Sequence, residues 1–231
     1  MSGANPVFGS LLDNILPRVP PFFQMLHEQT EMLVKTLSAL VVYLEKGEPI
    51  RAGEVAALES QAAEFKEKML EVLNNAFSTP MDREDVYRAI CSIHEPIWSA
   101  RIAAEEMDAL GIKSDRYAVE IATILREAAT ALERGYAKLD KSPASADGDA
   151  VAASRCQTNI DKAYRRALAA LYNVDETLQS LQADASNSKV DAMNRVVDIL
   201  KRREMYRHLH FAGRQMADAG TVLHGIIVQM S

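Results

Sequence analysis

Residues 23–49 read FQMLHEQTEMLVKTLSALVVYLEKGEP. From Phe23 to Leu44 the apolar positions, with Thr30 among them, return at alternating steps of three and four residues, which is the spacing of one face of an α-helix. The G-E-P turn at Gly47–Pro49 then ends the pattern, because glycine and proline commonly stop a helix. This stretch predicts a long amphipathic helix, and its strict rhythm is typical of helices packed nearly parallel in a bundle.

Five further stretches repeat this rhythm and predict five more helices. They span residues 55–76, 86–107, 121–139, 160–181 and 189–229. Pro96 lies inside the third predicted helix, where we expect a local kink, and Lys141–Asp149 is the most linker-like segment. No strand pattern competes with the helical one. The sequence therefore predicts an all-α protein of six long helices, arranged as two three-helix bundles in tandem over residues 1–113 and 114–231.

Length and composition narrow the class of protein. The chain has 231 residues, of which 48% are apolar and 25% charged, enough to bury a sizeable core. Cys91 and Cys156 lie far apart without a C-x-x-C pattern, so we interpret them as small apolar residues of a reduced compartment. The first residues lack a secretory signal, and no apolar run approaches the roughly 18 residues of a membrane span. These features predict a soluble, cytoplasmic protein.

Several activities are disfavoured. The chain has no G-x-S-x-G, P-loop or G-x-G-x-x-G motif, so we expect no enzyme. A pI near 5.5 and 6% aromatic residues disfavour nucleic-acid binding.

The N-terminal segment Phe8–Phe23 is rich in apolar residues. We expect it either to pack over one end of the bundle or to contact a membrane or transporter.

Basic residues gather in the last two predicted helices. They are Arg155, Lys162, Arg165, Arg166, Lys201, Arg202, Arg203 and Arg207. One interpretation is a solvated face laced with salt bridges. The other is an anion-binding face for lipid headgroups or an acidic partner.

The segment AFSTPMDREDVYRAI, at Ala76–Ile90, joins the second and third predicted helices. Pro80 prevents the second helix from continuing. Asp82 suits the N-cap of the third, and Asp85 places another carboxylate beside the free N–H groups of the first turn. We treat Asp82, Arg83 and Asp85 as structural residues of this corner.

The same segment, with Glu59 upstream, resembles the PhoU-related phosphate transport regulators, in the branch once called domain of unknown function 47. That branch shares a TF-x-TP-x-DRED corner. The stretches Pro17–Gln29, Asp161–Tyr172 and Glu204–Ile227 extend the resemblance over nearly the whole chain. It implies one PhoU-like domain made of two similar three-helix bundles and a link to Pit-type, low-affinity phosphate transport.

The resemblance also implies where metal ions would bind. Members of the family carry E/D-x-x-x-D pairs on two helices of each bundle, which hold iron or other hard metal ions. The corresponding positions here are occupied by Glu59, Ala63, His94, Trp98, Gln157, Asp161, His210 and Arg214. Because only Glu59 and Asp161 are carboxylates, we expect the metal cluster to be lost.

Two expectations follow for these positions. Arg214 would replace the metal's positive charge by forming a salt bridge with Asp161. Alternatively, Glu59 with His94, or Asp161 with His210, would hold a single zinc or iron ion, although each pair supplies only two ligands. Otherwise no cofactor is expected.

The leading hypothesis is a non-enzymatic regulator or accessory of inorganic phosphate transport that acts by docking, with a low-affinity phosphate transporter as partner. It would sit in the cytoplasm, at the inner face of the membrane when docked, and a homodimer is one arrangement it could adopt. One alternative is a metal-binding relative with reduced sites. The other is a structural helical assembly protein unconnected with phosphate.

Overall fold

A computed structural model describes residues 20–173 and 189–231 of the chain. This part of the chain contains six α-helices, one short 3-10 turn and no strand, which confirms the all-α prediction. The helices are α2 (Phe22–Lys46), α3 (Pro49–Asn75), α4 (Arg83–Leu110), α5 (Arg116–Lys138), α6 (Asp147–Leu171) and α8 (Lys189–Met230), and the 3-10 turn η1 spans Pro143–Ala146.

Local chemistry sets several helix ends. Gly47 and Gly111 follow α2 and α4 with φ of 65° and 61°, a left-handed conformation that glycine adopts without strain. The Gly47 N–H donates to the Tyr43 carbonyl at 2.8 Å. Asp115 caps α5 because its Oδ1 accepts the N–H groups of Tyr117 and Ala118. The first predicted helix therefore ends at the G-E-P turn, as expected.

The helix before the long α8 differs from its expected position. The apolar pattern predicted a helix over 160–181, but α6 begins at Asp147 and takes in the end of the expected linker Lys141–Asp149. Its first turns bury the small residues Ala150 and Ala153, which give a weak hydrophobic signal in the sequence. The expected helix beyond residue 173 and most of the segment Phe8–Phe23 lie outside the described residues.

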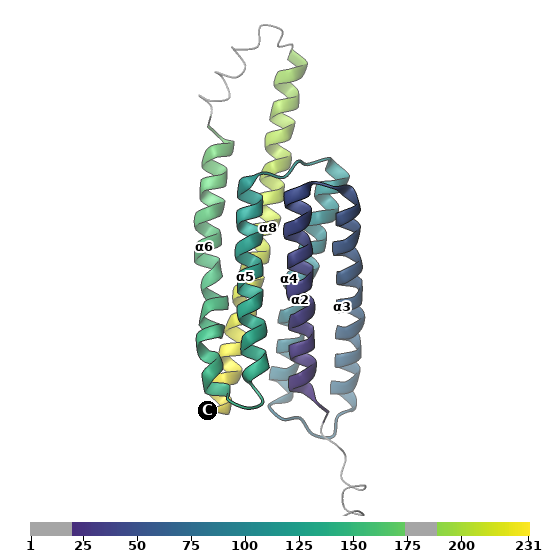
Figure 1. Cartoon of the computed structure of the whole chain (residues 1–231), viewed down its shortest axis with the longest axis vertical. Helices are drawn as coiled ribbons and strands as arrows, with labels where there is room; N and C mark the ends of the chain where they lie inside the picture. The colour runs from purple at the N-terminus through teal and green to yellow at the C-terminus, as the bar shows by residue number, and fades with distance from the viewer. Residues whose placement is uncertain (1–19, 174–188) are drawn as a thin grey trace, which may run out of the picture.

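Consecutive helices run in alternating directions and form one elongated bundle (Figure 1). α2, α3 and α4 contact one another, and α6 and α8 both pack on α5 and on each other. The two groups are joined along their length, because α2 also packs on α5 and α4 packs on α8. α4 continues as one helix through Pro96.

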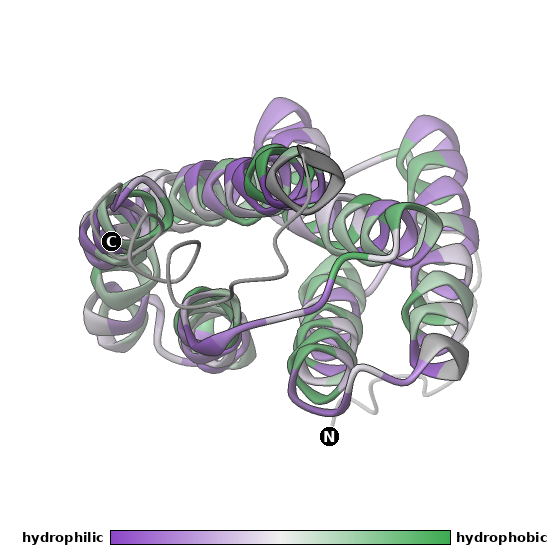
Figure 2. Cartoon of the chain, turned by 90° about the horizontal axis from the view of Figure 1, so that it is seen from above, coloured by the Kyte–Doolittle hydropathy of each residue, from purple (hydrophilic) through white to green (hydrophobic). Residues whose placement is uncertain are grey.

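A single connected apolar core runs through all six described helices. Figure 2 looks along the bundle and shows apolar and polar residues interleaved on each helix, as an amphipathic bundle requires. Tyr136 and Tyr206 are among the largest fully buried side chains. The Tyr206 hydroxyl donates to Asp115, which ties α8 to the start of α5. None of the described helices combines the length and apolarity of a membrane span.

α8 is longer than the bundle that it packs against. It has 42 residues, whereas α5 has 23. At about 1.5 Å per residue this makes α8 roughly 63 Å long, and Figure 1 shows its first turns projecting beyond the ends of α2 to α5. The projecting turns expose an apolar row of Met193, Val196, Val197 and Leu200, each between 40% and 64% exposed. We call these four residues the α8 row.

Candidate functional site

Asp82 is the N-cap residue of α4. Its Oδ1 accepts the backbone N–H of Glu84 at 2.9 Å, so the side chain satisfies one of the free donors of the first turn. Asp85 is 7% exposed in the same turn, and its Oδ1 lies 3.6 Å from Arg88 Nη1. Both carboxylates are thus engaged in starting the helix.

Arg83 caps the C-terminal end of α3, the helix that precedes this corner. Its guanidinium donates to the carbonyl oxygens of Leu73 at 2.5 Å and Ala76 at 2.6 Å. These carbonyls belong to the last turn and C-cap of α3, where few backbone donors are available; Leu73 also accepts the Ala76 N–H at 3.3 Å. The D-R-E-D sequence therefore caps the end of one helix and the start of the next.

Glu59 on α3 and His94 on α4 lie close together, and both are almost fully buried. Glu59 Oε1 is 3.7 Å from His94 Nε2, and Glu59 Oε2 accepts a hydrogen bond from Arg101 at 2.9 Å. Burial lowers the pKa of His94, and the positive charge of Lys66 lowers it further, while Glu59 opposes both. The Arg101 guanidinium thus supplies a positive charge beside the buried carboxylate.

The first-half positions do not fit a multinuclear metal centre. Ala63 offers no ligand atom, and Trp98 is a 43% exposed indole. Of the two remaining residues, Glu59 already accepts a charged hydrogen bond from Arg101. Hard metal ions require several oxygen ligands, and this position supplies one carboxylate.

Asp161 on α6 and His210 on α8 form the corresponding pair in the second half. His210 Nε2 lies 2.7 Å from Asp161 Oδ1, and the same oxygen accepts a hydrogen bond from Gln157 at 2.7 Å. The Tyr164 ring stacks on His210 with centroids 4.4 Å apart. This stacking holds the imidazole over the carboxylate. Both side chains are partly exposed and line a shallow hollow with Arg165 and Arg214.

The expected salt bridge between Arg214 and Asp161 is not formed. Within the described structure Asp161 pairs with His210, whereas Arg214 is exposed and has no ion pair within 4.0 Å. His210 is closer in position and is fixed by Tyr164, while a guanidinium in water gains little from an exposed ion pair. In the first half an arginine does contact the carboxylate at the family position, because Arg101 pairs with Glu59.

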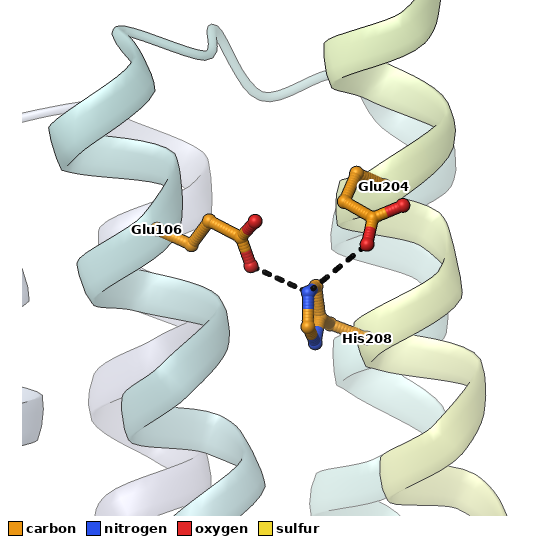
Figure 3. A group of neighbouring side chains, drawn as sticks. All are labelled: Glu106, Glu204 and His208. Carbon is orange, nitrogen blue, oxygen red and sulfur yellow. Dashed lines mark ion pairs between the residues drawn. The ribbon is translucent and has the colours of Figure 1, made fainter.

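A third group of side chains was not expected from the sequence. Glu106 on α4 and Glu204 and His208 on α8 bring their ligand atoms within 4.8 Å of one another (Figure 3). His208 Nε2 lies 2.5 Å from Glu106 Oε2 and 3.7 Å from Glu204 Oε1. No other group of three histidine, cysteine or carboxylate side chains in the described ranges converges in this way.

The two remaining histidines show a common pattern. His27 pairs with Glu133 at 2.8 Å and His224 with Asp147 at 2.7 Å, and in both cases the partner lies on another helix. Every histidine of the chain thus faces a carboxylate across a helix interface. A single histidine–carboxylate contact is therefore ordinary here, and the group with two carboxylates is distinct.

The basic residues of the last two helices are engaged in several salt bridges. Arg166 pairs with Glu120 at 2.5 Å, and Arg202 contacts both Asp198 and Asp115. These contacts favour the interpretation of this face as solvated and laced with salt bridges.

Cys156 is buried, and burial raises the pKa of its thiol to about 12, so it stays a neutral, small residue.

No protein-family model matches the sequence, and no curated protein matches it. Solved structures do match. A PhoU-like protein from Shewanella oneidensis MR-1 superimposes with a TM-score of 0.64 at 12% sequence identity, covering 90% of this chain and 99% of that one. The fold is PhoU-like.

A second structure from Shewanella oneidensis MR-1 gives the same result. It is described as a PhoU-like phosphate regulatory protein and superimposes with a TM-score of 0.63, again at 12% identity over 90% of this chain and 99% of that one. The PhoU-like fold thus accounts for nearly the whole chain. At this identity the similarity concerns the fold, and the side chains of the site have to be interpreted from this chain itself.

Proposed function

We propose that this protein regulates the uptake of inorganic phosphate by docking on a phosphate transporter, and that it does so without catalysing a reaction. The observation that carries the proposal is the PhoU-like fold over 90% of the chain, which a PhoU-like phosphate regulatory protein shares. The D-R-E-D corner, whose residues hold α3 and α4 together, adds support. Docking would place the protein at the cytoplasmic face of the membrane.

We further propose that the metal cluster implied by the family resemblance is lost at its original positions. Arg101 supplies the positive charge beside Glu59, and Asp161 is held by His210 and Gln157. Both carboxylates are thus satisfied by protein groups. Regulation would then depend on surface contacts and not on a cluster at these positions.

The α8 row is the surface on which we expect the transporter to dock. Met193, Val196, Val197 and Leu200 recur at the spacing of one helix face and project beyond the bundle. Exposed apolar side chains that gather in one place commonly mark interaction sites. The neighbouring basic residues Lys201 and Arg203 would suit a partner segment that carries acidic residues.

Capture of the transporter by variants of the α8 row tests this proposal. Val196→Glu combined with Leu200→Glu places two charges in the row, and both residues are too exposed to be needed for folding. Val228→Glu is the matched control, because Val228 is 63% exposed near the other end of the same helix. Tagged proteins would be incubated with detergent-solubilised host membranes from cells grown at low and at high phosphate.

We expect the wild type and the Val228→Glu control to retain an inorganic phosphate transporter, identified by mass spectrometry. We expect the double variant to retain at least about tenfold less transporter, because a charge placed at the centre of an apolar interface commonly weakens binding by this much. Absence of the transporter from the wild-type sample would contradict the proposal. Size-exclusion chromatography of each variant shows whether the row instead joins two copies of this chain.

A further inference from the structure

The group formed by Glu106, Glu204 and His208 lies between α4 and α8 (Figure 3). Glu204 and His208 are four residues apart, so they share one face of α8, and Glu106 reaches them from α4. We call these three residues the EEH group. It joins α4 to α8, whereas the positions implied by the family resemblance face each other across α3–α4 and α6–α8.

His208 places a buried ring nitrogen between two carboxylates. Its Nε2 is buried and faces two carboxylates, yet its approach to Glu106 lacks hydrogen-bond geometry. A lone pair on Nε2 pointing at two carboxylates would be repelled. Nε2 therefore has to carry a hydrogen or bind a metal ion that lies between the three groups.

The donor set favours a metal ion. One imidazole nitrogen and two carboxylate oxygens are a common ligand set for zinc and other first-row divalent ions. Such ions, with bonds of about 2.0–2.2 Å in tetrahedral geometry, hold their ligand atoms roughly 3.3–3.6 Å apart. The separation of 3.7 Å between His208 and Glu204 fits this spacing, and Glu106 would withdraw by about 1 Å.

The group is also accessible to an ion and to water. The side chains of Glu106, Glu204 and His208 are 34%, 36% and 19% exposed. Water can therefore complete the coordination shell, as in sites with three protein ligands. We propose that the EEH group binds one divalent transition-metal ion of the zinc type, and that this ion ties α4 to α8.

Arg207 competes with the ion for Glu204. Its guanidinium donates two hydrogen bonds to Glu204 Oε1, one of them at 2.8 Å from Nε. The pair is exposed and lies three residues apart on one helix, so it is weak. Binding of a metal ion by Glu204 would have to displace this contact or use the other carboxylate oxygen. Removing Arg207 should consequently strengthen metal binding.

Isothermal titration calorimetry of chelator-stripped protein with zinc chloride tests the site. We expect one equivalent to bind, and we expect Glu106→Gln and His208→Gln each to lower the affinity at least about tenfold. Arg207→Gln should bind more tightly than the wild type. His210→Gln and Asp108→Asn are matched controls with unchanged affinity, since His210 belongs to the Asp161 pair and Asp108 is an exposed acid of α4.

Thermal unfolding gives a second readout. At a free zinc concentration of about one hundred times the dissociation constant, the melting temperature of the wild type should rise by roughly 5–10 °C. The rise should be absent in Glu106→Gln, whose helical circular dichroism shows whether it folds. Failure of the stripped wild type to bind zinc would overturn the proposal, and so would a loss of binding in His210→Gln with retention in His208→Gln. Neither result bears on docking through the α8 row.

Discussion

At the scale of single residues, the first-half position shows a buried carboxylate paired with a guanidinium. Glu59 is 3% exposed, and an unpaired charge at that depth would cost several kcal/mol. Arg101 donates to it at 2.9 Å and also pairs with Glu105, so one guanidinium serves two acids. The remaining Glu59 oxygen faces His94 at 3.7 Å.

His94 makes the stability of the protein depend on pH. Burial, aided by Lys66, holds the pKa of His94 below its ordinary value, while Glu59, Glu67 and Glu95 oppose this shift. The unfolded chain therefore binds the His94 proton at a higher pH than the folded chain does. As the pH falls through the ordinary histidine pKa of about 6.5, protonation favours unfolding, and stability is lost.

We predict that His94→Gln makes the free energy of unfolding fall less steeply between pH 7.5 and pH 5. Urea denaturation at a series of pH values measures this, with the wild type as reference. The two curves should converge as the pH is lowered, because the cost of protonating His94 exists only in the wild type. Curves that stay parallel over this range would show that His94 is not the responsible group.

Residue-level partners were only partly predictable from the sequence. The stripe of family positions could be read from helical spacing, but Arg214 and His210 both line the hollow beside Asp161, and helical spacing does not show which of them pairs with it. The Glu204–His208 spacing was visible in the sequence as two possible ligands one turn apart. Glu106 was not, because it comes from a helix almost one hundred residues earlier.

At the scale of elements, α6 and α8 approach each other closely through glycine. A Cβ atom on Gly220 would lie 2.7 Å from the Ser154 backbone nitrogen and 3.0 Å from the Ala150 carbonyl oxygen. Backbone atoms cannot move aside as a flexible side chain can, so the two helices would have to separate. The hydrophobic pattern does not reveal such an approach, since it reports which face is buried and not how near the neighbour lies.

We predict that Gly220→Ala destabilises the protein by about 1–3 kcal/mol, the usual cost of overpacking a close contact. Gly225→Ala on the same helix is the matched control, because a Cβ there meets nothing within 4 Å. That control should be neutral or stabilising by up to about 1 kcal/mol, since alanine is the better helix former. Chemical denaturation of both variants measures the difference, and equal stabilities would refute the close approach.

Helix positions were the best-predicted elements. Five predicted helices match α2, α3, α4, α5 and α8, although α3 and α5 begin six and five residues earlier than the apolar pattern indicated. The sixth, α6, starts thirteen residues before the apolar pattern at Ile160 because alanines form its buried face. Small residues bury little area and therefore leave little trace in hydrophobic periodicity.

At the scale of the whole molecule, the two predicted three-helix groups share one continuous core. α2 packs on α5 and α4 packs on α8, and the EEH group and the Asp115–Tyr206 contact cross between the groups. A substitution at the α4–α8 interface can therefore alter the packing of both groups. The α8 row projects from this bundle, which suits a surface that carries a partner contact.

Uptake of labelled inorganic phosphate by host cells lacking this protein tests the central claim most directly. Loss of the protein should change the uptake rate or its response to phosphate starvation, and the wild type and Val228→Glu should restore normal behaviour. Val196→Glu with Leu200→Glu should fail to restore it despite normal folding and abundance. Unchanged uptake in cells without the protein, or full restoration by the double variant, would contradict the account.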